Sequence, residues 1–340
     1  MRKIKNLIIL YPSFERGGAT VNLINFINSC AQKNIKTHLI TNINKKDRNK
    51  FLKKNIKFII LNNKVNYKIF NRLSTSIKSI FLLLNLFKII DTKNSLVVSF
   101  QSHILPIIFS RIFKRKIIIR NSEDIIDATK YADYKFSAYL IFLLKIFFYN
   151  LSSGVITNSN NAKKSLDKII LNNKTKLIYN PYLNEVFNKK NNKRSNLILS
   201  VGRLCKQKNQ TIAIKAFAIF LKKFPNYKLI LIGHGKDYAK LKELCLSLNI
   251  SKNVIFKGWV SYPKKYYLKA KILIFPSLYE GLPNTLIEAV NFNLPCISTR
   301  CSGATDILTD NYGTYIPRYN HMILAEKMIY FISNYKKVLS

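Results

Sequence analysis

The sequence predicts an α/β fold made of two Rossmann-like domains, each built on a doubly wound parallel sheet. Short runs of Ile, Leu and Val alternate with segments long enough for helices, which is the β-α-β rhythm of such folds. The runs are continuously apolar, which indicates strands that are covered on both faces. A polar stretch interrupts the rhythm, which then restarts at Leu197. A chain of 340 residues has room for two domains.

The strands of the first half are expected where apolar runs rich in β-branched residues occur. They are Asn6–Leu10, Ile35–Ile40, Ile56–Leu61, Ser95–Phe100, Lys116–Arg120, Gly154–Thr157 and Lys176–Tyr179. Tyr11-Pro12 ends the first run after Leu10, so the run is too short for the core of a signal peptide and is interpreted as a buried strand.

The domain boundary is predicted in a stretch rich in Asn and Lys, where the strand and helix pattern stops. We expect an amino-terminal domain over 1–183, a linker over 184–195 and a carboxy-terminal domain over 196–340. The strands of the second half are Leu197–Val201, Lys228–Ile232, Asn253–Phe256, Ile272–Phe275, Cys296–Ser298 and Thr314–Ile316. Two such domains facing one another would hold a ligand in the cleft at their strand ends.

Two long apolar stretches, Ile77–Ile90 and Phe136–Leu151, are predicted to be helices and not membrane spans. Lysines interrupt both, and neither reaches the roughly 18 apolar residues that a span needs. Each helix either faces the core or lies in a membrane interface with its lysines extended toward water. The basic charge favours the second alternative for Phe136–Leu151.

The net charge of +41 must attract polyanions, whether nucleic acid, anionic lipid or nucleotide phosphate. It is spread evenly, +22 over residues 1–170 and +19 over residues 171–340, which argues against a basic tail and leaves compositional drift as an alternative cause. The five cysteines form no C-x-x-C pair, so neither a disulfide framework nor a zinc site is indicated, and a cytoplasmic location fits.

The strongest candidate site follows the strand Ile272–Phe275, in the segment from Pro276 to Glu288. Pro283 suits the first turn of a helix, and Gly281 allows backbone to approach closely, so the amides near Gly281 and Leu282 can face an anion. Glu280 and Glu288 offer carboxylates that accept hydrogen bonds from sugar hydroxyls. The junction therefore suits a ligand that carries both phosphate and sugar.

Glu280 and Glu288, seven residues apart, resemble the E-x7-E motif of the retaining GT-B glycosyltransferases of family 4, the glycosyl transferases group 1 of the bacterial surface-polysaccharide type. Further signatures occur in the family's order. Arg203 and Lys208, after the strand Leu197–Val201, resemble its phosphate-binding segment, and Gly17-Gly18 resembles its amino-terminal glycine loop. The resemblance covers essentially the whole chain.

The resemblance implies a role for each of these residues. Glu288 would hold the ribose, and Glu280 would approach the transferred sugar. Glu280 and His103 are the two candidates for catalytic residues. Donor diphosphate would contact Arg203, Lys208, Gly18, Gly281 and Leu282, and the nucleotide base would lie near Gly233, His234 and Gly258. Arg grips phosphate oxygens bidentately and Lys acts as a point charge, so these two cations can stand in for a metal. No cofactor or metal is expected.

His103 follows the strand Ser95–Phe100, where family members often place a polar residue near the reacting sugar. A structural role for this histidine is the alternative. The sequence departs from the family pattern at Thr20, where many relatives have a carboxylate, and in the segment Ser302–Asp306. The chain also ends soon after the helical run His321–Tyr335, whereas family members often carry a longer last helix that crosses back to the first domain.

The expected function is that of a retaining hexosyltransferase which moves a hexose or N-acetylhexosamine from a nucleotide sugar, UDP-linked by preference, to a lipid-linked or polysaccharide acceptor in lipopolysaccharide or capsule biosynthesis. A cytoplasmic protein, peripheral on an anionic inner membrane surface, fits the charge. The alternatives are a noncatalytic GT-B relative or a GT-B sugar-nucleotide epimerase. A nucleic-acid-binding protein is a remote third, since no dedicated basic motif accompanies the charge.

Overall fold

The computed structural model describes residues 4–14, 17–42, 57–60, 68–181, 194–261, 263–308 and 313–335. The predicted linker, residues 184–195, lies outside these ranges except for Arg194 and Ser195. Each of two compact units contains a parallel sheet with helices on both faces, so the predicted α/β fold with two doubly wound sheets is confirmed.

One unit comprises Met1–Ile125 with Phe136–Tyr182, and the other comprises Ile126–Lys135 with Leu183–Ser340. The structure assigns the short segment Ile126–Lys135 to the second unit, whereas the division expected from the sequence keeps it in the first domain. Its contacts are with the second unit.

The first unit has a seven-stranded sheet in the order β3-β2-β1-β4-β5-β6-β7, with parallel neighbours throughout. The strands are β1 Asn6–Ser13, β2 Lys36–Asn42, β3 Lys57–Ile60, β4 Ser95–Ser99, β5 Ile117–Arg120, β6 Gly154–Thr157 and β7 Thr175–Leu177. All seven strands predicted for this half are present, and their ends shift by at most three residues.

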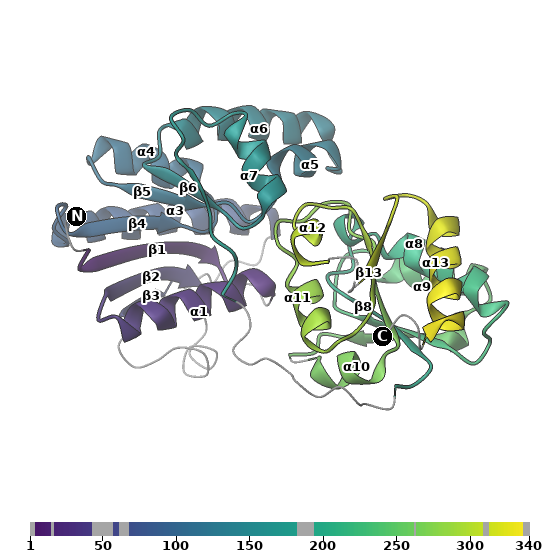
Figure 1. Cartoon of the computed structure of the whole chain (residues 1–340). Coiled ribbons are helices and arrows are strands. Elements are labelled where there is room, and N and C mark those ends of the chain that lie inside the picture. The colour runs from purple at the N-terminus through teal and green to yellow at the C-terminus, as the bar shows by residue number, and fades with distance from the viewer. Residues whose placement is uncertain are drawn as a thin grey trace. The chain divides into compact units, whose positions relative to one another are not determined.

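Helices cover both faces of the first sheet (Figure 1). They are α1 Gly18–Gln32, α3 Lys68–Ile89, α4 Ile104–Ile112, α6 Lys135–Asn150 and α7 Asn160–Asp167. One core cluster joins α1 to the sheet through Leu23 and Ile27. The other joins α3, α4 and α7 to the opposite face. The order with β1 and β4 at its centre puts the topological switch between these two strands, where α/β sheets bind ligands.

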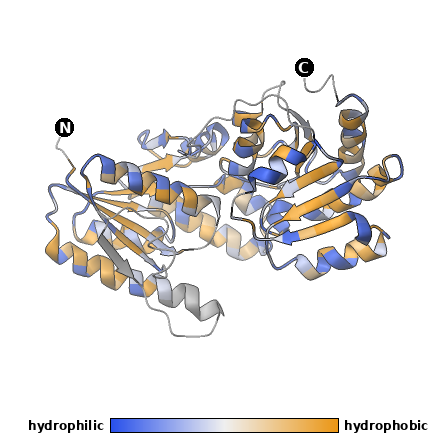
Figure 2. Ribbon diagram, turned by 90° about the horizontal axis from the view of Figure 1, so that it is seen from below, coloured by the Kyte–Doolittle hydropathy of each residue, from blue (hydrophilic) through white to orange (hydrophobic). Residues whose placement is uncertain are grey.

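The second unit has a six-stranded parallel sheet in the order β10-β9-β8-β11-β12-β13. Its strands are β8 Leu197–Val201, β9 Lys228–Ile232, β10 Val254–Gly258, β11 Ile272–Phe275, β12 Cys296–Thr299 and β13 Gly313–Ile316. All six predicted strands are again present. Figure 2 shows these strands as largely hydrophobic, as expected for a sheet that is covered on both faces.

The helices of the second unit form two layers around its sheet. They are α5 Ile125–Lys130, η1 Lys206–Lys208, α8 Gln210–Leu221, α9 Tyr238–Ser247, η2 Ser251–Asn253, α10 Lys264–Lys269, α11 Asn284–Asn291, α12 Ala304–Ile307 and α13 His321–Ser333. Helices α8, α9 and α13 share one core cluster, and α10, α11 and α12 share the other.

Arg194 fixes the start of the second unit. Its guanidinium donates hydrogen bonds to four backbone carbonyls, those of Tyr267, Ala270, Phe292 and Asn293, at 2.7–2.9 Å. These carbonyls lie at the carboxyl ends of α10 and α11, so one side chain from the predicted linker ties the start of β8 to two helix ends.

The two apolar stretches are helices, as predicted, and they differ in burial. Helix α3 buries Ile80, Leu83 and other apolar side chains in the core, as the core-facing alternative requires. Helix α6 buries Tyr149 alone, while Phe136 and Phe147 are 84% and 63% exposed. Within the described ranges, no helix combines the length and apolar character that crossing a bilayer takes.

Candidate functional site

The predicted donor-binding residues gather along one edge of the second sheet. Strands β10, β9, β8 and β11 are parallel neighbours, so their carboxyl ends meet at the same edge. Gly258, Gly233, Arg203 and Glu280 each lie at or just beyond one of these ends. The tertiary fold therefore brings together residues that are up to 77 positions apart in the sequence.

Glycine is required where these strand ends meet. The amide of Gly233 donates to the carbonyl of Gly258 at 2.8 Å, and that of Gly202 donates to the carbonyl of Ile232 at 2.9 Å. A Cβ on Gly233 would lie 2.0 Å from the Gly202 oxygen, closer than atoms can approach. The exposed ring of His234 lies against Gly258, where a Cβ would be 3.0 Å from it. The loops thus form a tightly packed backbone surface.

Lys208 and Glu280 form an ion pair on this edge. The Lys208 Nζ lies 2.5 Å from the Glu280 Oε1, and the two side chains are only 15% and 12% exposed. The ammonium also lies 5.1 Å from the centre of the Phe275 ring. The lysine stem passes over Gly202, where an added Cβ would be 3.2 Å from Cδ. A phosphate that binds Lys208 would therefore share the ammonium with Glu280.

Arg203 is exposed, and its guanidinium donates to the Gln207 side-chain oxygen at 3.2 Å. Gln207 in turn donates to the carbonyl of Tyr279 at 3.0 Å, next to Glu280. Its own carbonyl accepts from the amide of Leu278 at 2.8 Å. Gln207 therefore links the loop after β8 to the loop after β11, a role that no sequence pattern indicated.

Gly281 and Leu282 are buried in the loop that enters α11. Pro283 caps this helix and has no side-chain acceptor to offer its first amides. Gly303 packs on the loop, since a Cβ there would lie 1.9 Å from the Gly281 oxygen. The positive end of the helix dipole is thus held beside Glu280 and Lys208, in the orientation that favours an anion.

Glu288 lies little more than one turn into α11. The hydroxyl of the buried Tyr267 donates to its carboxylate. Tyr267 stacks on Phe292 with ring centres 5.7 Å apart, so packing fixes the donor. Nothing in the sequence pointed to Tyr267, since a tyrosine in a short helix is usually core.

His103 lies at the carboxyl end of β4 in the first unit and is the residue that precedes α4. Its Nδ1 is 2.9 Å from the Ser99 hydroxyl, which itself donates to the carbonyl of Gln101 at 3.0 Å. A hydroxyl has one proton, so Nδ1 must donate to Ser99, and Nε2 carries the lone pair. Burial, with the positive charges of Lys145 and Arg120, lowers the pKa of His103 to about 3, so the ring is neutral.

Gly18 is exposed at the start of α1, after β1, the position expected for a glycine loop. Two residues further on, the hydroxyl of the buried Thr20 lies 2.8 Å from that of Tyr11. Arg120 at the end of β5 is buried and donates to Ser122 and Asn180, at 2.6 and 2.5 Å. The carboxyl edge of the first sheet therefore also carries polar side chains.

Arg318, after β13, is a further residue that the sequence did not single out. It donates to the carbonyl of Leu278 at 2.7 Å and to Asp127 at 2.6 Å, and it lies over the ring of Tyr131. Asp127 and Tyr131 belong to the segment Ile126–Lys135. Asp133 of the same segment pairs with Lys206 and Lys236 at 3.4 and 2.6 Å. The segment thus contacts the loops that hold Arg203 and His234 directly, and the loop that holds Glu280 through Arg318.

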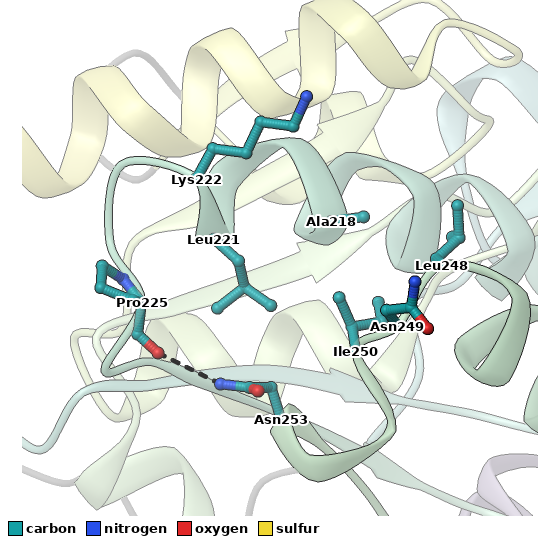
Figure 3. Close-up of a pocket in the computed structure, with 8 residues that line it drawn as sticks. All are labelled: Ala218, Leu221, Lys222, Pro225, Leu248, Asn249, Ile250 and Asn253. Carbon is teal, nitrogen blue, oxygen red and sulfur yellow. Dashed lines mark hydrogen bonds between the residues drawn. The ribbon is translucent and has the colours of Figure 1, made fainter.

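Across the described part of the chain, no cluster of three or more His, Cys, Asp or Glu side chains is arranged to hold a metal ion. A hollow of about 350 Å³ lies between the end of α8 and the loop after α9 (Figure 3). Its lining is mainly apolar, with a hydrogen bond of 3.2 Å from Asn253 to the carbonyl of Pro225. It lies at the amino ends of β9 and β10, at the opposite edge of the sheet from the predicted donor residues.

Residues 184–339 match the family described as glycosyl transferases group 1. An uncharacterized glycosyltransferase of Methanocaldococcus jannaschii is 37% identical over 183 residues, which are 50% of this chain and 45% of that protein. An α-1,4-N-acetyl-D-galactosaminyltransferase of Campylobacter jejuni, acting on a diphosphoundecaprenol-linked sugar, is 34% identical over 173 residues, 49% of this chain and 48% of that protein. The chain thus spans about half the length of these relatives.

Solved GT-B glycosyltransferases share the fold over nearly the whole chain. The Anabaena protein HepE, in complex with UDP-glucose, superposes with a TM-score of 0.76 at 18% identity, covering 98% of this chain and 91% of HepE. Staphylococcus aureus TarM superposes with a TM-score of 0.78 at 14% identity, covering 99% and 93%. At these identities the likeness establishes the GT-B fold, as predicted from the sequence.

Proposed function

We propose that this chain, a homologue of the group 1 glycosyltransferases with a GT-B fold, is a retaining glycosyltransferase that moves a hexose or N-acetylhexosamine from a nucleotide sugar to a glycan acceptor. One observation carries the proposal. The largely buried Lys208–Glu280 ion pair lies in the loops that lead from β8 and into α11, the helix that bears Glu288, so a cation, a helix amino end and two carboxylates belong to one end of the sheet.

Donor binding follows from the chemistry of this edge. Arg203, Lys208 and the first amides of α11 would stabilise the charge on the departing diphosphate. Glu288, held by Tyr267, would accept hydrogen bonds from the ribose hydroxyls. The backbone around Gly18 would contact the diphosphate, and that around Gly233, His234 and Gly258 would lie near the base. These cations would take the place of a metal, so we expect activity without one.

UDP is the expected nucleotide, since the solved structure of HepE contains UDP-glucose. Glu280 and His103 are the candidates for contact with the transferred sugar. The unprotonated Nε2 of His103 is suited to accept a hydrogen bond from a sugar hydroxyl. A lipid-linked acceptor is expected because the Campylobacter relative acts on one.

We further propose that the protein lies on the inner, anionic face of the cell membrane. The exposed apolar side chains of α6 and the net charge of +41 suit an interface in which rings enter the lipid and lysines reach phosphate.

The test is binding and turnover with a panel of nucleotide sugars. Calorimetry would measure UDP binding to the wild type and to Glu288→Ala, and nucleotide release would be followed with membrane extract as the acceptor source. We expect binding to weaken at least tenfold in Glu288→Ala, which loses hydrogen bonds to a charged group. Glu243→Ala removes an equally charged, exposed glutamate from α9 and should match the wild type.

Product analysis decides between the proposal and its alternatives. A glycosylated lipid with retained anomeric configuration supports the transferase. Conversion of the sugar nucleotide to its epimer without an acceptor would indicate an epimerase. Binding of the sugar nucleotide without any turnover would indicate a noncatalytic relative. Retention of nucleic acid at physiological salt, with no nucleotide-sugar binding, would overturn the proposal.

A further inference from the structure

A second hollow, of about 440 Å³, lies in the first unit at the end of α4. Its lining residues are Ser110, Arg111, Lys114, Arg115, Lys116 and Ser153. Four of the six are cations. The strands β4 and β5 begin near this hollow, so it lies at the sheet edge opposite His103.

The exposed cations of the hollow have no ion-pair partner among the described residues. Arg111, Lys114 and Lys116 are exposed, and none of them forms an ion pair with a carboxylate in the described ranges. Arg115 is buried, and its guanidinium is held by the Ser95 hydroxyl at 3.0 Å and by the carbonyl of Phe87. Asp91 is close enough to act on Arg115 electrostatically, and it accepts from the Lys93 amide and from Asn94.

The dipole at the end of α4 explains part of this charge, because cations are favoured at a helix carboxyl end. It does not explain four cations around one hollow, since like charges repel one another.

Ser110 provides an independent sign of a ligand. Its side chain is fully buried and lines the hollow, yet its hydroxyl has no hydrogen-bond partner. Buried hydroxyls are normally paired, so an orphan hydroxyl beside a basic hollow indicates an acceptor that completes the site. A phosphate group offers acceptor oxygens to the hydroxyl and negative charge to the cations.

Exposed apolar side chains flank the lining residues of the hollow in the sequence. Ile112 and Phe113 directly precede Lys114 and are 64% and 44% exposed. The ring of Phe113 contacts that of Phe87 at the end of α3, two residues before Ile89, which is 80% exposed. Water-exposed Ile and Phe beside a phosphate site are expected where the phosphate belongs to a lipid whose acyl chains begin next to it.

We propose that this hollow binds the phosphate of an anionic lipid headgroup, with Arg111, Lys114, Lys116 and the Ser110 hydroxyl as ligands and Ile89, Ile112 and Phe113 entering the acyl region. The proposal goes beyond glycosyl transfer and does not depend on it, because its test uses no sugar donor.

The experiment is cosedimentation of the full chain with vesicles of phosphatidylcholine, with and without one third phosphatidylglycerol, at physiological salt. Lys114→Gln with Lys116→Gln should weaken binding to the anionic vesicles about tenfold to thirtyfold, since each basic residue at such a surface contributes about fivefold. Lys223→Gln with Lys228→Gln removes two exposed, unpaired lysines from the second unit and should change binding less than about twofold. If the two double variants lost vesicle binding equally, overall charge alone would drive binding, and the proposed lipid site would be wrong.

Ser110→Ala separates ligand binding from folding. Removing an orphan buried hydroxyl should leave resistance to urea equal or higher, while binding to anionic vesicles falls about threefold. Unchanged vesicle binding, or equal binding to vesicles without phosphatidylglycerol, contradicts the proposal. Inorganic phosphate at constant ionic strength should compete weakly, and complete competition would assign the hollow to free phosphate instead of a lipid.

Discussion

At the scale of single residues, hydrogen bonds and ion pairs fix the orientation of each candidate site side chain. Tyr267 holds the Glu288 carboxylate, and Glu280 holds the Lys208 ammonium. In the first unit Ser99 fixes the tautomer of His103, so that the lone pair lies on Nε2. Positioning of this kind determines which proton-accepting group a sugar would meet.

The lowered pKa of His103 also predicts how the free energy of unfolding depends on pH. Its pKa in the fold, about 3, lies below the ordinary value of 6.5. Between these values the unfolded chain binds a proton that the folded chain does not, so the free energy of unfolding should fall as the pH drops from 6.5 toward 3. Urea unfolding at neutral pH and near pH 5 should show a smaller fall in His103→Gln than in the wild type.

The control for this experiment is His234→Gln, because His234 is an exposed histidine in the other unit. That variant should retain the wild-type dependence on pH. If His103→Gln lost as much stability on acidification as the wild type, protonation of His103 would not be the cause.

At the scale of elements, the site depends on how loops pack at the strand ends. Gln207 and Arg318 donate hydrogen bonds to carbonyls of the loop from β11 to α11, and Gly303 packs against the same loop. Gly303 has a φ of +73°, which residues with a Cβ rarely adopt. Its conformation and its closeness to Gly281 both require glycine.

We therefore predict that Gly303→Ala displaces the entry to α11. The substitution should lower the free energy of unfolding by about 2 kcal/mol or more, through backbone strain and steric overlap. UDP binding should weaken with it, as measured by calorimetry. Gly154→Ala in β6 is the matched control, because the nearest atom to an added Cβ there is the Lys174 carbonyl oxygen at 3.5 Å, an ordinary contact. Wild-type stability and affinity in Gly303→Ala would show that the loop relaxes freely.

At the scale of the whole molecule, the chain does not divide in simple sequence order. The segment Ile126–Lys135 comes from the first half and packs with the second unit. Its anchors are Asp127 on Arg318 and Asp133 on Lys206 and Lys236. A chain with 57 basic and 16 acidic residues thus uses two of its few carboxylates to hold this segment.

The partly buried pair of Asp127 and Arg318 should be energetically coupled. We predict a coupling free energy of about 1–2 kcal/mol in a double-mutant cycle of Asp127→Asn and Arg318→Gln, measured by urea unfolding. The exposed pair Lys163–Asp167 on α7 is the reference and should give at most about 0.5 kcal/mol. Coupling no larger than that of the reference pair would mean that other contacts hold the segment.

The sequence by itself determined the α/β class, every strand of both sheets and the positions of the predicted donor residues at strand ends. Continuous apolar runs and turn residues are local signals, and parallel strands with right-handed crossovers leave few topologies. Only the tertiary structure decided that Lys208 pairs with Glu280, that Tyr267 and Gln207 support them, and that Ile126–Lys135 joins the second unit. Those contacts join residues 21 to 191 positions apart, and they depend on side-chain packing across elements, which leaves no periodic pattern in the chain.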